Sequence, residues 1–296
     1  MLDRGGLVSG PEICGDVALS LKDQWRYVSY GLRQIVGSIG QRCPLDVARI
    51  DFDNDDVRSK ILEGASPLRV YTASLAADVL KRNLGEDGPI CDIGCGAGSH
   101  SRFFETSAGH HFYIGVDVAL NSGWPWQSAL AHRLPCRFAQ MTAGDLGIAT
   151  GSLAFTFSSS SLEHVPNIQL AVAEIARVMR SGSYGLHVVP GVWSLFLYLF
   201  HGYRRFHPKS LADLFQSASL NVERIWSLGG LPSFLLHALW ITGLETIVLR
   251  HALHLRLQLR TGKALSLYVL LLNLALRLDP LLPLAPAGYG VLIRKP

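Results

Sequence analysis

The sequence predicts an α/β fold in which a mostly parallel sheet is flanked by helices. Short apolar runs alternate with stretches of helical spacing between residues 69 and 226, which is the pattern of consecutive right-handed βαβ units. Hydrophobic residues make up 49% of the 296 residues and charged residues only 17%. That composition excludes intrinsic disorder as the state of the whole chain, because there is ample apolar surface to bury.

The elements of this fold follow one another in a regular order. Apolar residues at helical spacing predict a helix over 69–84, and the glycines and proline at 85–89 end it. The remaining expected elements are strands at 90–93, 112–116, 153–157, 184–189, 220–226 and 289–294, and helices at 99–106, 168–179 and 208–219. In such a sheet, ligands bind beyond the carboxyl ends of the strands.

A glycine-rich segment, Asp92-Ile93-Gly94-Cys95-Gly96-Ala97-Gly98, directly follows the first of these strands. Its glycines allow a tight turn and a close approach of the backbone to a ligand. The segment departs from the dinucleotide fingerprint, because Ser99 stands where that motif needs Gly or Ala, and it lacks the Lys of a Walker loop. Asp92 suits a cationic amino-acid group better than a pyrophosphate, and Asp117 ends the next strand, where an acid can accept hydrogen bonds from ribose hydroxyls.

In these motifs, the sequence resembles the class I S-adenosylmethionine-dependent methyltransferases, close to the small-molecule and quinone-type branch. The segments that carry the resemblance, in order, are 92–98, 115–117, 158–165, 174–182 and 290–296. The resemblance covers about residues 65–230 and the last strand. It implies a Rossmann-like class I methyltransferase sheet flanked by helices, S-adenosylmethionine as the cofactor and methyl transfer as the reaction.

The resemblance also implies roles for individual residues: the glycine loop would hold the methionine end, Asp117 the ribose and Thr142-Ala143 the adenine. The implied cofactor-binding residues are Asp92, Gly94, Cys95, Gly96, Gly98, Asp117, Val118, Thr142, Ala143 and Ser158. Thr142 stands where the family usually has Asp, and Leu153-Ala154 stands where it tends to have Phe-Asp. These departures leave open a non-catalytic membrane- or partner-binding protein on a degenerate methyltransferase fold.

Candidate catalytic and substrate-binding residues follow the fourth and fifth strands of that fold. His164 is the candidate base for a hydroxyl or phenol acceptor, with helix capping as an equal alternative, and Glu163 is as readily structural as catalytic. The candidate substrate-binding residues are Tyr198, His201, Tyr203, Arg204 and Arg205. Aromatic, His and Arg side chains together suit an anionic or sugar-bearing head group, and an interfacial belt against lipid explains them equally.

The apolar and basic excess of the chain lies near its end. Residues 231–296 carry a net charge of +5 and residues 1–230 a net charge of −1, which suggests an anionic membrane surface as a partner and disfavours nucleic acid. Residues 225–244 hold no formal charge, but a Gly-Gly-Leu-Pro break interrupts them, and the uncharged run 264–276 is short for a span.

A last strand in the same sheet would exclude a single membrane crossing. A hairpin that lies in the membrane interface is therefore favoured, with a soluble helical lid as the alternative. Residues 253–260 alternate strictly between apolar and polar, which nominally indicates a strand, although their composition favours helix; we expect helix.

The predicted organisation is an N-terminal helical extension (1–64), a methyltransferase core (65–226), an apolar, membrane-associated helical insertion (227–286) and the last core strand (287–296). The cysteines are odd in number and lack metal-site spacing, which indicates a reducing compartment. No metal is expected at the acidic cluster 51–56 either, because it lacks the Gly and Glu of a calcium loop.

No signal peptide is visible at the start, so we expect a cytoplasmic protein, associated with the membrane peripherally or monotopically. The expected function is methyl transfer from S-adenosylmethionine to a hydrophobic, or lipid- or glycan-linked, small-molecule acceptor at the membrane surface. The sequence specifies neither the acceptor nor the oligomeric state.

Overall fold

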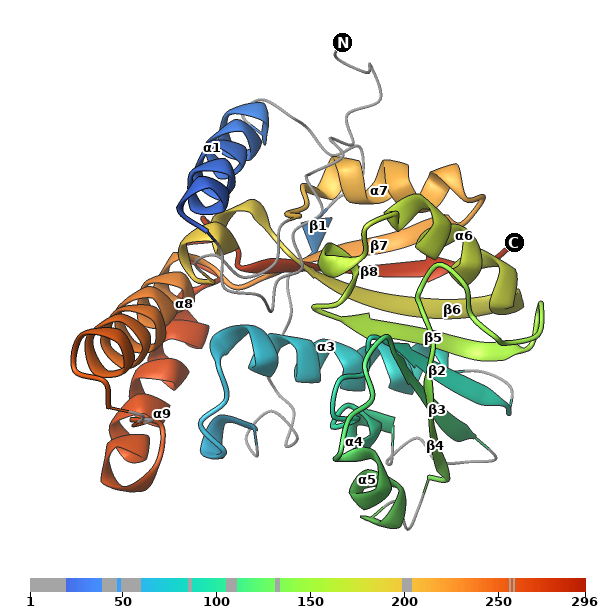
Figure 1. The fold of residues 1–296 in the computed structure, drawn as a ribbon, viewed down its shortest axis with the longest axis horizontal. Helices are drawn as coiled ribbons and strands as arrows, with labels where there is room; N and C mark the ends of the chain where they lie inside the picture. Colours follow the sequence, from blue (N-terminus) through green and yellow to red (C-terminus); the bar gives the residue numbers. More distant parts are fainter. Residues whose placement is uncertain are drawn as a thin grey trace.

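The structure is a computed structural model, in which a mixed sheet carries helices on both faces and a group of helices at one end (Figure 1). It describes residues 20–38, 47–48, 60–84, 87–104, 111–130, 134–198, 204–255, 257 and 259–296. The predicted α/β fold is confirmed, including the helix near the N-terminus and the apolar helices before the last strand.

One sheet of eight strands organises the molecule, in the order β1-β7-β8-β6-β5-β2-β3-β4. The strands are β1 (Val47–Ala48), β2 (Pro89–Ile93), β3 (Phe112–Asp117), β4 (Cys136–Gln140), β5 (Leu153–Ser159), β6 (Met179–Pro190), β7 (Asn221–Leu228) and β8 (Gly288–Arg294). β8 runs antiparallel between β6 and β7, and the other pairs are parallel. The strand order reverses at β2, which lies between β3 and β5 and so forms a topological switch point.

Helices bury their apolar faces against both sides of this sheet. The helices are α1 (Leu21–Ser38), α3 (Pro67–Asn83), α4 (Ser101–Phe104), α5 (Trp124–Leu130), η2 (Leu162–His164), α6 (Ile168–Val178), η3 (Val192–Phe196), α7 (Pro208–Ser217), α8 (Leu231–Leu236), the π-helix η4 (His237–Ala252) and α9 (Gly262–Leu278). One core joins α3 and α4 to the sheet, and a second joins α6 and α7 to its other face. β2 and β5 are buried almost throughout, as expected of central parallel strands.

Three strands differ from the prediction. β1, a two-residue strand at one edge of the sheet, was not predicted. β4 was not predicted as a strand, because it lies at the edge of the sheet and carries Arg137 and Gln140, which weaken its apolar signal. β6 begins at Met179, ahead of the strand expected at 184–189, and its early part is polar and exposed.

The helix expected over 253–260 is wrong for the described part of that segment. Residues 253–255, 257 and 259–260 form no helix. The N–H of Leu253 bonds to the carbonyl of Val248 at 3.0 Å, and His254 takes a φ of +54°. A left-handed residue cannot continue a right-handed helix, so η4 ends here whatever the composition favours.

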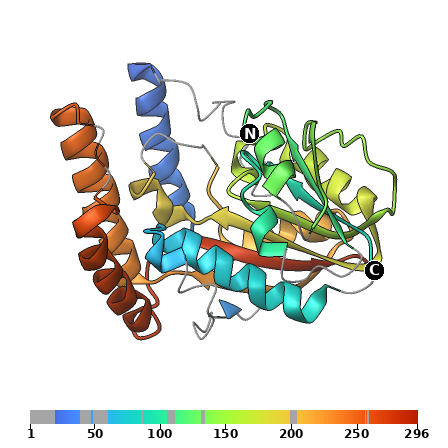
Figure 2. The ribbon, with the colours of Figure 1, turned by 90° about the horizontal axis from the view of Figure 1, so that it is seen from below.

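The insertion forms two neighbouring helical segments, α8-η4 and α9 (Figure 2). The Gly-Pro break predicted inside the apolar run is the start of a helix, since Gly230 is the N-cap and Pro232 lies in the first turn, where proline is tolerated. Residues 231–252 are long and apolar enough to cross a membrane, with a mean hydropathy of 1.4 and 22% of the window buried. Because β8 then returns to the middle of the sheet, a single crossing would separate β8 from its partners.

Buried polar contacts attach this insertion to the core. Asp279 Oδ2 accepts a hydrogen bond from the Tyr71 hydroxyl at 2.6 Å, and its Oδ1 accepts from the Ser233 N–H at 2.9 Å. Glu245 is buried and forms an ion pair with Arg260 at 3.0 Å. Both acids of the insertion are therefore buried, and the hydrogen bond between Tyr71 and Asp279 holds the insertion against α3.

Candidate active site

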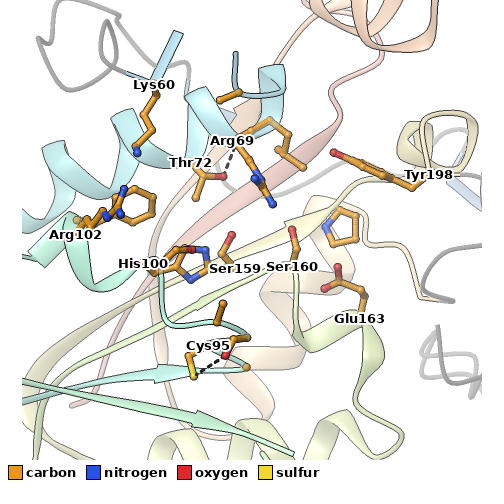
Figure 3. A pocket seen from close by; sticks show the side chains of 18 of the residues that line it. Lys60, Arg69, Thr72, Cys95, His100, Arg102, Ser159, Ser160, Glu163 and Tyr198 are labelled. Carbon is orange, nitrogen blue, oxygen red and sulfur yellow. Dashed lines mark hydrogen bonds between the residues drawn. The ribbon is translucent and has the colours of Figure 1, made fainter. Parts of the chain in front are cut away.

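A cavity of about 570 Å³ lies beyond the carboxyl ends of β2 and β5 (Figure 3). This is the switch point of the sheet, where ligands of open α/β folds bind. Residues 94–103 form one wall, residues 159–163 a second and the segment that leads into α3 a third. Pro190, Tyr198 and Arg205 complete the lining.

The glycine loop has a shape that larger residues would not permit. Gly94, Gly96 and Gly98 have φ values of +77°, +53° and +80°. A Cβ on Gly94 would overlap the side chain of Ser161, and one on Gly98 would overlap the Phe138 ring, whereas Gly96 faces open space. The loop is therefore fixed on one side and open on the cavity side, so a ligand can approach its backbone closely.

Asp92, at the end of β2, is fully buried behind this loop. Its Oδ2 accepts hydrogen bonds from the Tyr113 hydroxyl at 2.5 Å and from His100 Nδ1 at 3.0 Å. Its Oδ1 has no hydrogen-bond partner among the described residues. His100, which the sequence analysis did not single out, lines the cavity, and its place within the loop that follows Asp92 was the available signal.

Asp117 connects the glycine loop to the segment that follows β3. Its Oδ2 accepts from the N–H of Gly96 at 2.8 Å and its Oδ1 from the N–H of Ala119 at 3.1 Å. The neighbouring Val118 is 66% exposed, so its side chain is accessible at the loop surface. The Trp124 indole donates to the carbonyl of Gly96 at 2.8 Å, which braces the same loop from outside.

The predicted adenine-side residues lie in the turn after β4. Thr142 is exposed and Ala143 is half-buried. The N–H of Asp145 donates to the Thr142 carbonyl at 3.1 Å, so this turn does contain a carboxylate, three residues beyond the position where the family usually has it.

The serines after β5 divide between the core and the cavity. Ser158 is buried, and its Oγ lies 2.8 Å from His187 Nδ1, so its side chain points away from the cavity. Ser159 and Ser160 line the cavity instead. Ser160 has a φ of +51°, a strained conformation for a residue with a Cβ and one that clusters at functional sites.

Glu163 and His164 lie on η2, but only Glu163 lines the cavity. The Glu163 side chain is buried, and its Oε2 has no hydrogen-bond partner among the described residues. Burial raises the pKa of Glu163 to about 7, against the opposing effects of its own backbone N–H and of the charge on Arg205. His164 Nε2 lies 3.8 Å from Glu163 Oε1, and His164 is not among the residues that line the cavity. Glu163 is therefore better placed than His164 to meet an acceptor.

Of the predicted substrate-binding residues, some line the cavity and others do not. Tyr198 and Arg205 line the cavity. Arg204 instead donates to the carbonyls of Val165, at 2.7 Å, and Pro166, at 3.2 Å, and so holds the loop after η2. His201 and Tyr203 lie outside the described residues.

Three cations that line the cavity were not anticipated: Lys60, Arg69 and Arg102. Arg69 lies in the first turn of α3, and its guanidinium is directed into the same space as Ser160 and Glu163 (Figure 3). A helix N-terminus disfavours a cation, and this first turn contains no acid. The positive charge of Arg69 and the positive end of the α3 helix dipole therefore both lie at the cavity, where they suit an anionic group of a ligand.

Residues 91–186 match the family of methyltransferase domains. The matched segment contains the glycine loop, Asp117 and Glu163. No curated protein gives a significant match to the chain.

Solved structures with the same fold extend over most of the chain. The 4+2 cyclase SpnF is 17% identical, with 92% of this chain and 96% of that chain covered at a TM-score of 0.54. A geranyl diphosphate methyltransferase in complex with SAM is 13% identical, with 87% and 100% covered at 0.53. A Galdieria sulphuraria protein assigned as a sarcosine dimethylglycine methyltransferase is 16% identical, with 82% and 98% covered at 0.51.

The fold is the one that class I methyltransferases share, and residues 91–186 match a methyltransferase domain, as the sequence motifs implied. The fold alone does not fix the reaction, because one structure that shares it is a cyclase. The match of residues 91–186 to a methyltransferase domain is the observation that supports methyl transfer. The chain thus contains a segment that matches methyltransferase domains, and S-adenosylmethionine is the cofactor that this class of domain uses.

Proposed function

We propose that this methyltransferase modifies a hydrophobic, or lipid- or glycan-linked, small-molecule acceptor at the cytoplasmic surface of a membrane. The buried, unpartnered Glu163 on a cavity next to the glycine loop is the observation that carries the reaction site. The exposed apolar helices of the insertion support the membrane surface. In this proposal the chain divides into an extension (1–64), a core (65–226), a lipid-contacting insertion (227–286) and the last core strand (287–296).

The residues of the glycine loop fit the cofactor. The loop presents an open backbone at Gly96, and behind it the buried Asp92 has a free carboxylate oxygen that can accept a hydrogen bond from an ammonium group. Arg69, which also lines the cavity, supplies a cation for a carboxylate. Asp117 would accept from ribose hydroxyls, and Val118, Thr142 and Ala143 would border the adenine. Gly94, Cys95 and Gly98 shape the loop, and Ser158 would contribute only through its backbone.

S-adenosylmethionine, when bound, supplies a methyl group on a cationic sulfur. The chain's task is then to position the acceptor in line with that methyl group and to receive any proton that the acceptor loses. Glu163 Oε2 would take the proton of an acceptor hydroxyl. Its pKa of about 7 places it between its two protonation states near neutral pH, where a general base is most effective.

The acceptor would lie between Glu163, Tyr198 and Arg205. Tyr198 offers an aromatic face and Arg205 a buried cation, so this end of the cavity suits an acceptor with an apolar body and a polar head. Arg204 and His164 would act indirectly, by positioning the loop and Glu163.

Calorimetric titration with S-adenosylmethionine and S-adenosylhomocysteine tests the cofactor site. We expect Asp117→Ala to weaken binding about 100-fold, because two charge-assisted hydrogen bonds are lost. Leu170→Glu, on the exposed face of α6, is the matched control and should bind as the wild type does. Equal affinity of Asp117→Ala and the wild type would refute the site.

A further inference from the structure

The exposed apolar side chains of the protein gather at one end. Among the described residues, the large hydrophobic side chains that are exposed lie on α1, η3 and residues 231–284; the exceptions are Leu62, Phe112, Val118, Leu120 and Leu170. In both ribbon views α1 and the insertion helices occupy the same end of the molecule (Figures 1 and 2). Soluble monomers rarely expose a contiguous apolar patch of more than a few hundred Å², so this surface needs an occupant.

α1 contributes a stripe that the fold does not use. Residues at intervals of three or four are exposed along it: Leu21 (77%), Trp25 (74%), Val28 (42%), Leu32 (58%) and Val36 (67%). Its other face is already buried, through Tyr27 and Tyr30, against η3. An amphipathic helix whose apolar stripe remains outside after folding is the form taken by helices that lie in a membrane interface.

The insertion carries corresponding stripes on both of its helices. On α9 the exposed side chains are Leu267, Leu270, Leu274 and Leu278, again at helical spacing. On η4 they include Leu239, Leu244 and Val248, at the wider spacing of a π-helix. Three helices from distant parts of the sequence therefore each turn a leucine-rich face outward.

The exposed charges on the insertion have one sign. Arg250, Lys263 and Arg277 are exposed, whereas the acids Glu245 and Asp279 are buried and paired. Anionic lipid head groups complement such a surface. A second copy of the chain, docked through the same face, would instead bring these cations together.

Each of the three helices also touches the wall of the cavity. The Tyr27 hydroxyl of α1 donates to the Tyr198 carbonyl at 3.0 Å, and the His237 ring of η4 stands edge-on to the Tyr198 ring at 4.9 Å. The Tyr268 hydroxyl of α9 donates to the Ala65 carbonyl at 2.8 Å. Tyr198 and Ala65 both line the cavity, so the apolar end and the cavity share a boundary.

We infer that α1, η3 and the α8-η4-α9 hairpin form one surface that lies in the head-group region of an anionic bilayer and holds the cavity beside the lipid. This inference deepens the proposed function, since it adds the N-terminal helix as a second anchor and makes the bilayer the source of the acceptor. α1 has to act together with the hairpin, because either alone would leave apolar stripes in water.

Vesicle flotation with phosphatidylglycerol-containing and pure phosphatidylcholine vesicles tests the surface. Trp25→Glu/Leu32→Glu, in α1 alone, should lower the vesicle partition coefficient at least tenfold, because each change removes an exposed apolar side chain that the bilayer would bury. Arg250→Ala and Lys263→Ala should each lower it about fivefold, on the anionic vesicles only. Leu170→Glu is the matched control and should float as the wild type does. Unchanged flotation of the α1 variant would overturn the inference.

A dye on Leu62→Cys tests where the cavity lies relative to the lipid. Leu62 is 64% exposed and precedes Glu63, which lines the cavity. The emission of the dye on Leu62→Cys should shift to the blue when anionic vesicles are added. The emission of the same dye on Leu170→Cys should not shift. No shift at Leu62, or a stable dimer in light scattering that Trp25→Glu/Leu32→Glu dissociates, would overturn the inference. A protein that floats but does not bind S-adenosylmethionine would refute the proposed function alone.

Discussion

The buried acids of the core and those of the apolar end differ in one respect. In the core, Asp92 Oδ1 and Glu163 Oε2 are buried without hydrogen-bond partners among the described residues. In the insertion, Glu245 is paired with Arg260, and Asp279 accepts from Tyr71 and Ser233. An unsatisfied buried oxygen costs free energy, so it persists where a ligand or a proton completes it, whereas satisfied acids stabilise the fold. The first pair lies at the proposed reaction site, whereas in the second pair Glu245 stabilises the hairpin internally and Asp279 attaches it to α3.

Replacement of Glu163 is the strongest test of this contrast. Glu163→Gln should lower kcat about 100-fold or more, because the amide cannot accept the proton of the acceptor. The affinity for S-adenosylmethionine should stay unchanged. Steady-state kinetics with methyl-labelled cofactor, together with calorimetry, separate the two effects. A variant with full kcat would leave Glu163 a structural residue.

The pH dependence of the wild type sharpens the same test. The pKa of Glu163 rises from 4.5 to about 7 on burial, so the active carboxylate forms as the pH rises through about 7 and the rate should rise with it. The effect on stability has the opposite sign. Between pH 4.5 and about 7 the folded state binds more protons than the unfolded state, so the free energy of unfolding falls as the pH rises. Both dependences should be absent in Glu163→Gln.

On the apolar side, Asp279 should govern stability without affecting chemistry. Asp279→Ala leaves the Tyr71 hydroxyl and the Ser233 N–H without an acceptor in a buried place, and should lower the free energy of unfolding by about 3 kcal/mol. Asp279→Asn keeps an acceptor oxygen and should cost less. Urea denaturation measures both. Equal effects of the two variants would show that charge, and not hydrogen bonding, attaches the hairpin.

The parts of the core with a local signal could be predicted from the sequence, and the parts made by tertiary contacts could not. The glycine loop and Asp117 could be predicted, because each is a short run of sequence that directly follows or ends a predicted strand. Arg69 lies 23 residues before Asp92 and reaches the site only because α3 packs across the sheet. Ser158 shows the reverse limit, since one residue along a strand turns a side chain to the opposite face, and His187 rather than the cavity receives it.

The apolar end of the molecule was likewise predictable only where the signal was local in the sequence. Composition located the insertion and its basic excess, but not the partnership with α1, which depends on two segments more than 190 residues apart, Leu21–Ser38 and Leu231–Leu236. The burial of Glu245 and Asp279 could not be predicted from composition either. The exposed surface of the insertion carries only positive charge because these two acids are buried in the folded structure.

The smallest expected effect separates the closed and open sides of the glycine loop. Gly98→Ala would force its Cβ into the Phe138 ring and should destabilise the fold by about 2 kcal/mol or more, whereas Gly96→Ala meets no atom and should cost about 1 kcal/mol for its positive φ alone. Gly96 lines the cavity, so its variant should instead lose cofactor affinity, as calorimetry would report. Thermal unfolding ranks the two variants. If Gly96→Ala proved the less stable of the pair, or bound the cofactor as the wild type does, then the loop would not be open on the side where the backbone has to meet its ligand.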